Sequence, residues 1–144
     1  MKGAIQAVEV SYLVHPTEDA ERLRSRVEGG LDIGVEPQES RLEGHFGYPI
    51  LLVQYHITGD AATALVNRLA QKLSPAAKRT LRETAGESID EHSALYLRLD
   101  KQELVSGRLS LGGSDAVRVK IKPRLFQVKG EIMEFYRSAV RLDG

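Results

Sequence analysis

The chain has 144 residues, of which 42% are hydrophobic and 28% charged, values typical of an ordinary globular domain. Lys+Arg and Asp+Glu both number 20, so the formal net charge at pH 7 is zero. This balance argues against a strong general nucleic-acid binder, whose domain is usually basic throughout, and any nucleic-acid surface must come from local segregation of charge. The absence of cysteine excludes disulfides, thiolate zinc sites and cysteine nucleophiles.

No stretch of the sequence approaches the roughly 20 consecutive apolar residues of a membrane-spanning helix. The first ten residues have no long apolar core and carry Gln6 and Glu9, unlike a secretory signal. We therefore predict one domain over residues 1–144, located in the cytoplasm and without a membrane partner.

The N-terminal third predicts a strand followed by a helix. Residues 4–14 have apolar residues at both odd and even positions, and therefore on both faces of a strand, which is typical of a strand inside a sheet. His15-Pro16 ends this strand, because the residue before proline is kept out of the helical region. Thr17 then suits the cap of a helix that Gly29-Gly30 would stop, and Leu31 to Glu39 reads as a loop.

Two strands and two helices follow. Residues 41–46 and 50–58 read as strands reversed at Gly47-Tyr48-Pro49, the second apolar on both faces. Asp60 suits the cap of a helix, and Ser74-Pro75 that of another running to about Ala85. The helix after Asp60 is predicted to bury one apolar face, formed by Ala61, Leu65, Leu69 and Leu73. A C-terminal helix is predicted over residues 130–142, with an apolar face formed by Ile132, Phe135, Tyr136 and Ala139.

The stretch from Ser93 to Pro123 predicts a hairpin with one apolar and one basic face. Apolar residues alternate with polar ones around Leu97 and again around Val119, on either side of the turn sequence Gly112–Asp115. If the runs pair antiparallel, their apolar sides share the core. The opposite face collects Tyr96, Arg98, Arg108, Arg118, Lys120 and Lys122.

The predicted order is β-α-β-β-α-α-β-β-α, an α+β fold with an antiparallel sheet and helices mainly on one face. A basic sheet face that carries an aromatic side chain suits the backbone of single-stranded RNA. A solvated face whose lysines discourage edge pairing explains the same pattern. Periodicity alone therefore predicts the fold but does not decide the function.

No motif in the sequence nominates an active site or a metal centre. The four histidines, at positions 15, 45, 56 and 92, lack the spacing of metal ligands. Nucleophile elbow, phosphate-binding loop and dinucleotide fingerprint are all absent. Gly44-His45-Phe46-Gly47 matches the GxxG string of KH domains, but it lies between predicted strands, whereas the KH loop joins helices. We predict no catalysis, no cofactor and no metal.

Three segments, taken in order, resemble a known family. They are His15-Pro16-Thr17-Glu18-Asp19, then Glu43-Gly44-His45-Phe46-Gly47-Tyr48-Pro49-Ile50, then Leu97-Arg98-Leu99-Asp100-Lys101-Gln102 with Gly107 and Asp115 behind it. Together they resemble the archaeal RNA-binding family regarded as a predicted exosome subunit. The resemblance covers about residues 5–123.

The resemblance implies an α+β fold related to a ribosomal protein of the large subunit that docks on the smallest ribosomal RNA. It also implies an archaeal source and a non-enzymatic role in RNA processing. One position departs from the family pattern, since Tyr48 stands where asparagine is usual before the proline. We interpret that position as part of a turn, where tyrosine costs little.

We predict a non-enzymatic RNA-binding protein whose partners are RNA, bound weakly or within an assembly, and exosome or RNA-processing proteins. The sequence does not decide between a monomer and a homo-oligomer. The alternative is a protein-interaction module without RNA contact, and a third reading is an enzyme with an unrecognised site. The predicted phosphate contacts are Arg98, Lys101, Arg108, Arg118, Lys120 and Lys122, with Tyr96 as a platform for a base.

Overall fold

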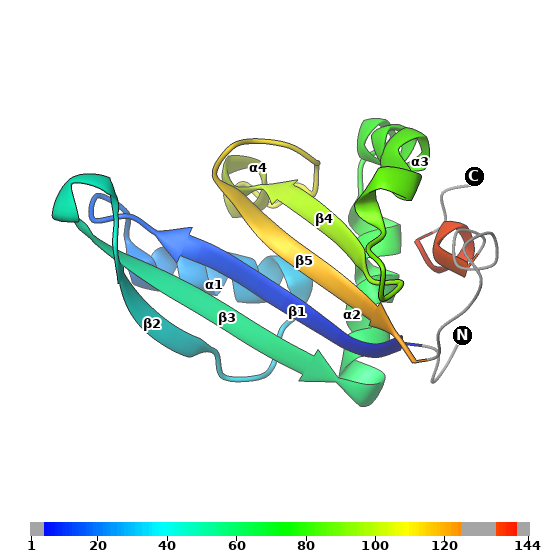
Figure 1. The fold of residues 1–144 in the computed structure, drawn as a ribbon, viewed down its shortest axis with the longest axis horizontal. Helices are drawn as coiled ribbons and strands as arrows, with labels where there is room; N and C mark the ends of the chain where they lie inside the picture. Colours follow the sequence, from blue (N-terminus) through cyan, green and yellow to red (C-terminus); the bar gives the residue numbers. More distant parts are fainter. Residues whose placement is uncertain (1–4, 125–134, 141–144) are drawn as a thin grey trace.

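A computed structural model describes residues 5–124 and 135–140 of the chain. It contains one five-stranded antiparallel sheet with strand order β2-β3-β1-β5-β4. Helices lie mainly behind one face of this sheet (Figure 1). The elements are β1 (Ile5–Val14), α1 (Ala20–Leu31), β2 (Gln38–Glu43), the 3-10 turn η1 (His45–Gly47), β3 (Pro49–Thr58), α2 (Gly59–Lys72), α3 (Pro75–Ser88), β4 (Leu95–Asp100), α4 (Lys101–Val105) and β5 (Ala116–Pro123). The predicted α+β class is confirmed.

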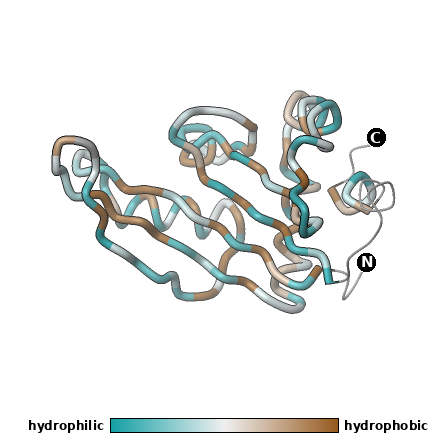
Figure 2. Tube along the Cα trace, viewed as in Figure 1, coloured by the Kyte–Doolittle hydropathy of each residue, from teal (hydrophilic) through white to brown (hydrophobic). Residues whose placement is uncertain are grey.

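Strand β1 is the centre of the sheet, as its apolar sequence predicts. It pairs with β3 on one side and β5 on the other, so that Val10 faces Tyr55 and Val119. All three side chains are buried. Hydropathy alternates along these strands, which gives the sheet one apolar and one polar face (Figure 2). We call the polar face, which points away from α1 and α2, the open face.

Helix α1 begins later and ends later than predicted. Its N-cap is Asp19, whose Oδ1 accepts the backbone N–H of Arg22 at 3.1 Å, so the prediction of Thr17 as the cap is wrong. The helix also continues through Gly29 and Gly30 to Leu31, and Asp32 caps it in the left-handed conformation. A Cβ on Gly30 would lie 2.7 Å from Leu104 Cδ1. Glycine here serves the close approach of α1 to α4 rather than a helix stop.

Strands β2 and β3 differ from the prediction in their bounds and burial. Strand β2 begins at Gln38, inside the predicted loop, and its six residues are exposed because it is the edge of the sheet. From Val53 onward β3 alternates between buried and exposed residues, so the prediction that it is apolar on both faces fails. At the tip between them, Phe46 and Gly47 have φ of 71° and 77°, and the side chains of Phe46 and Tyr48 are exposed.

Of the two helices after β3, α3 begins where the sequence predicts and α2 does not. Ser74 caps α3 by accepting the N–H of Ala77 at 3.0 Å, with Pro75 in the first turn, as predicted. Helix α2 instead begins with Gly59 after an N-cap at Thr58, so Asp60 lies in its first turn and is not the cap. Ala61 is exposed, and the stripe that α2 buries is Ala62, Leu65, Val66, Leu69 and Ala70.

The predicted hairpin is present, with one unpredicted insertion. Strands β4 and β5 pair antiparallel, with Leu97 opposite Val119. The short helix α4 follows β4 immediately, and Asp100 caps it by accepting the N–H of Glu103 at 3.0 Å. The segment around Leu109 therefore forms isolated bridges and not a strand.

The described part of the predicted C-terminal helix packs on the sheet of the same chain. Residues 135–139 are helical, whereas most of the predicted 130–142 helix, including Ile132, falls outside the described residues. The Tyr136 side chain is buried, and its hydroxyl donates to the carbonyls of Ser93 and Ile121. Burial raises the pKa of this phenol well above its usual value.

Candidate nucleic-acid interface

The open face is organised by the strand register, which places side chains of all five strands in one row. From one edge to the other, this row runs through Gln38, Gln54, Ser11, Arg118 and Arg98. Two amides and a hydroxyl occupy β2, β3 and β1, and two guanidinium groups occupy β5 and β4. Hydrogen-bonding and cationic groups are therefore segregated into two halves of the face.

The neighbouring row repeats this division. His56 faces Glu9, Glu9 faces Lys120, and Lys120 faces Tyr96. We call Tyr96, Arg98, Arg118, Lys120 and Lys122, which all belong to β4 and β5, the basic half of the open face. The neutral chain thus carries the local segregation of charge that a nucleic-acid surface requires.

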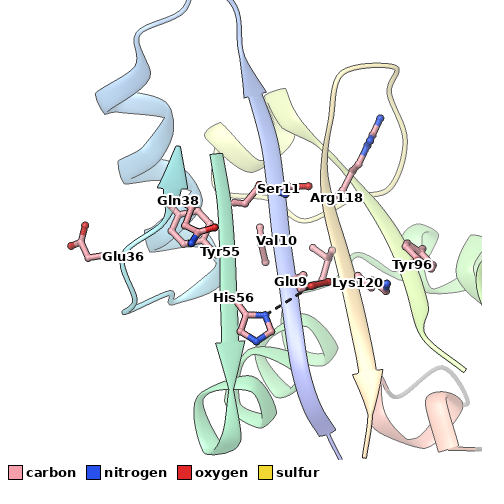
Figure 3. Close-up of a pocket in the computed structure, with 12 residues that line it drawn as sticks. Glu9, Val10, Ser11, Glu36, Gln38, Tyr55, His56, Tyr96, Arg118 and Lys120 are labelled. Carbon is pink, nitrogen blue, oxygen red and sulfur yellow. Dashed lines mark ion pairs between the residues drawn. The ribbon is translucent and has the colours of Figure 1, made fainter. Parts of the chain in front are cut away.

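A hollow of about 660 Å³ lies on the open face and spans both halves. Figure 3 shows Arg118 and Lys120 on one side of it, and Gln38 and Glu36 on the other. Its backbone floor comes from β1, β3 and β5. The hollow is open and polar, so it suits an extended polar chain better than a buried apolar ligand.

Tyr96 and Lys120 are held together on the basic half. The Lys120 ammonium lies over the Tyr96 ring, 5.2 Å from its centroid, and hydrogen bonding with this side chain raises the pKa of Lys120. The Tyr96 hydroxyl donates to Asp90 Oδ2 at 3.0 Å. Burial acts to raise the pKa of Asp90, but hydrogen bonds from the Ala94 N–H, Tyr96 and the His92 N–H outweigh it and lower that pKa. The ring is therefore fixed in place, with a cation next to it.

The other cations of the basic half differ in how far they are neutralised. Arg98 donates to the carbonyls of Gly113 and Ser114 at 3.4 and 3.3 Å, which hold the guanidinium without cancelling its charge. Among the described residues, the Arg118 side chain has no hydrogen-bond or ion-pair partner. Lys122 bonds Glu9 at 3.2 Å and is partly neutralised. Arg98 and Arg118 are thus the more available charges.

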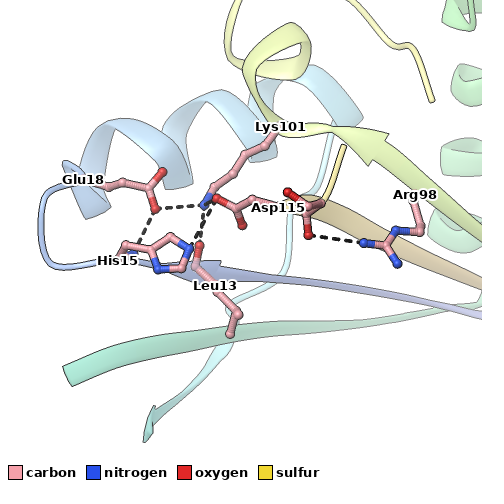
Figure 4. Close-up of polar contacts among 7 residues, drawn as sticks. Leu13, His15, Glu18, Arg98, Lys101 and Asp115 are labelled. Carbon is pink, nitrogen blue, oxygen red and sulfur yellow. Dashed lines mark hydrogen bonds and ion pairs between the residues drawn. The ribbon is translucent and has the colours of Figure 1, made fainter. Parts of the chain in front are cut away.

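Lys101 does not join the open face. Its side chain is 2% exposed, and its ammonium donates to Leu13 O at 2.6 Å, Glu18 Oε1 at 2.9 Å and Asp115 Oδ2 at 3.1 Å (Figure 4). His15 Nε2 lies 3.3 Å from the same Asp115 oxygen. Lys101 is the buried centre of an ion-pair cluster, and because its ammonium already bonds two carboxylates, it lies outside the open face where a phosphate contact was predicted.

The cluster of His15, Glu18, Lys101 and Asp115 joins two of the segments that carried the family resemblance. His15, Glu18 and Asp115 each offer a potential metal ligand, and these atoms lie within 4.8 Å of one another. The Lys101 ammonium bonds both acids, however, and supplies the positive charge that an ion would bring. We interpret the cluster as a structural tie between the end of β1, the start of α1 and the β4–β5 hairpin.

Arg108 also lies apart from the basic half. It follows α4, outside the strands, and its guanidinium is paired with Glu103 of that helix. This pairing raises the pKa of Arg108. The prediction placed Arg108 on the polar face of the hairpin, and the insertion of α4 removes it from the sheet.

Several polar residues of the open face were missed by the sequence analysis. Gln38 lay in a predicted loop, and Gln54 and His56 lay in a strand read as buried on both faces. The alternation from Val53 to Thr58 was the signal that could have revealed them. Their alignment with Ser11 and Arg118 depends on strand pairing, which no local pattern shows.

The fold and the segregated open face define a class of small α+β proteins with a sheet surface suited to polynucleotides. A family model described as RNA binding matches residues 7–123. The chain belongs to this RNA-binding family. The RNA-binding protein PAB1135 of Pyrococcus abyssi is 31% identical over 140 residues, which cover 91% of each chain.

Solved structures of archaeal proteins share the fold. Protein AF2318 from Archaeglobus fulgidus superimposes with a TM-score of 0.81 at 28% identity, covering 94% of this chain and 99% of that one. Mth689 from Methanothermobacter thermautotrophicus, a DUF54 protein, gives a TM-score of 0.78 at 25% identity, covering 95% and 98%. In the part of the chain that the structure describes, no helix is long and apolar enough to cross a membrane.

Proposed function

We propose that the protein binds single-stranded RNA directly on the open face, without catalysing a reaction. The observation that carries the proposal is the segregated basic half, in which the Arg98 and Arg118 side chains face each other across β4 and β5 and, among the described residues, neither forms an ion pair with an acid. Membership of an RNA-binding family supports the same conclusion. Phosphates of the RNA would contact Arg98, Arg118, Lys120 and Lys122.

The two halves of the face suggest how the RNA lies. With the backbone along β4 and β5, the bases point across β1 toward the amides of Gln54 and Gln38. Amide side chains can donate and accept at base edges, which unpaired bases leave accessible. Glu9 and Glu36 beside the hollow disfavour phosphates on that side. We propose that the basic half binds the backbone and the amide half contacts bases.

Tyr96 has a narrower role than an open platform. Because the Lys120 ammonium lies over its ring, a base stacks only on the remaining surface or after Lys120 turns toward a phosphate. We propose that the ring chiefly positions Lys120 and that stacking is secondary. Lys101 and Arg108 are not part of the proposed interface.

The salt dependence of affinity tests the proposal. Each phosphate contact to single-stranded RNA contributes about −0.7 to the slope of log affinity against log salt, so four contacts give roughly −3. Replacing Arg118 and Lys120 with serine should flatten the slope by about 1.4 and leave the fold intact, since both side chains point away from the core. Fluorescence anisotropy over a salt series measures this. A folded protein without salt-dependent binding to any RNA would favour the protein-interaction module.

We further propose that the RNA binding serves archaeal RNA processing, as a component associated with the exosome and acting in the cytoplasm. The archaeal relatives support the source, and the family resemblance supports the process. A fold relationship with a ribosomal protein of the large subunit belongs to the same proposal. Co-elution with purified archaeal exosome proteins on size exclusion, with and without RNA, tests the association, and separate elution under both conditions contradicts it.

A further inference from the structure

The helical side of the molecule carries a second basic surface, on the opposite side of the sheet from the open face. A hollow of about 540 Å³ lies among α1, α2 and the segment after α4. Four cationic side chains line it, two from α1 and two from α2: Arg22, Arg26, Arg68 and Lys72. We call this hollow the helical groove.

Helical spacing explains why the four cations meet there. Arg22 and Arg26 are four residues apart on α1, as are Arg68 and Lys72 on α2, so each pair lies one turn apart on one face of its helix. The buried stripes of both helices point to the sheet, with Val27 and Leu69 fully buried. The cations therefore stand beside those stripes and face the groove.

Arg68 ties the two helices together at the groove. Its Nε donates to Gly30 O at 3.0 Å, and a terminal nitrogen donates to Gly29 O at 3.3 Å. A guanidinium has five N–H donors, so several remain for a ligand. The glycines matter as well, because side chains at Gly29 and Gly30 would narrow the hollow. The helical groove is thus a concave cationic surface in which Arg68 is held in place by hydrogen bonds.

The helical groove is less neutralised than the open face. Its lining includes no acidic residue, and the described residues form no ion pair with any of its four cations. The open-face hollow, in contrast, is lined by Glu9 and Glu36. Four like charges in one groove repel each other and gain most from a polyanion.

We propose that the helical groove binds the phosphodiester backbone of a second RNA segment, so that one protein molecule holds RNA on two opposite faces. The groove carries charges but lacks the aromatic and amide groups of the open face, so it would bind phosphates without reading bases. This site is additional to the proposed open-face site and does not depend on it.

Isothermal titration with an eight-nucleotide single-stranded RNA at low salt tests the inference. Such an RNA is short enough to occupy one face only. We expect two molecules of RNA per wild-type protein, and one per protein after Arg26→Gln with Lys72→Gln. Arg79→Gln with Arg82→Gln, which removes the same charge from exposed positions of α3, is the matched control and should retain two. Thermal melting verifies that the variants are folded.

The outcomes separate the two sites. If the wild-type protein binds one RNA molecule, and R26Q with K72Q does not change this, the proposal of a site in the helical groove is wrong and the proposed open-face site is retained. Binding that survives Arg118→Ser with Lys120→Ser but disappears in R26Q with K72Q supports the groove and removes the open face. Equal losses in R26Q with K72Q and in the α3 control would show a general charge effect and overturn the groove.

Discussion

The β4–β5 hairpin holds two lysines in opposite environments. At the start of α4, directly after β4, Lys101 is buried, with two carboxylates and a carbonyl around its ammonium. In the middle of β5, Lys120 lies on the open face, over the Tyr96 ring and within reach of solvent. The sequence presents both as polar positions of one basic stretch. The difference shows that a cation's role is decided by which acids the fold brings to it.

The cluster around Lys101 and the open face have different roles in the hairpin. The cluster around Lys101 connects segments that are far apart in the chain, since Glu18 and Asp115 come from opposite sides of it in sequence. The open face presents cations whose partners are carbonyls, a ring or a single acid. We therefore expect substitutions at the cluster to change stability and substitutions on the open face to change RNA binding.

The largest expected effect is on the stability of Lys101→Met. Methionine keeps much of the volume but leaves Glu18 and Asp115 facing each other without a counter-charge. Because the Glu18 and Asp115 side chains are 24% and 43% exposed, water solvates part of their charge, and the loss should be about 2 kcal/mol, below that of a fully buried pair. Chemical denaturation measures the loss, and adding Glu18→Gln and Asp115→Asn should recover part of it. An unchanged free energy of unfolding would mean that the cluster is not a structural tie.

The same substitution at Lys120 is the matched comparison. Lys120→Met should alter the free energy of unfolding by no more than about 0.5 kcal/mol, because the side chain is on the polar face. The slope of log affinity against log salt should flatten by about 0.7, the contribution of one phosphate. Anisotropy over a salt series measures the slope. A stability loss as large as that of K101M would erase the contrast between the two lysines.

A smaller effect is expected at the start of α1, next to the cluster. Asp19→Ala removes the side chain that caps the helix and should lower the free energy of unfolding by about 1 kcal/mol. Thr17→Ala is the control and should stay within about 0.5 kcal/mol, since the exposed Thr17 precedes the cap. Both are measured by urea denaturation. The reverse ranking would restore Thr17 as the cap.

The smallest effect is expected for Tyr48→Asn, at the tip between β2 and β3, with Gly47→Ala as the contrasting variant at the same tip. Tyr48→Asn should leave stability and RNA affinity unchanged within error, because the Tyr48 side chain is exposed and outside the basic half. Gly47→Ala should cost about 1 kcal/mol, since Gly47 has a φ of 77°. Melting curves and anisotropy test both. A marked change in affinity for Y48N at constant stability would make the tip a binding loop.

Strong local signals predicted individual elements correctly. The alternation around Leu97 and Val119 predicted β4 and β5, and Ser74-Pro75 predicted the start of α3. The prediction failed at both ends of α1, where Asp19, two residues beyond the predicted cap Thr17, caps the helix, and Gly29-Gly30 does not stop it. Local chemistry fixes such caps only to within a few residues, because several side chains in a row can accept the same backbone N–H groups.

The sequence by itself determined an antiparallel α+β fold and a basic face on β4 and β5, because alternation with period two sends every second side chain to the same side of a strand. Tertiary structure alone decided the rest. Pairing of β1 with β3 and β5 aligned Gln54 and Ser11 with Arg118, and the meeting of Glu18 and Asp115 buried Lys101. Packing of α1 beside α2 formed the helical groove. These features depend on contacts between distant residues, which local patterns do not encode.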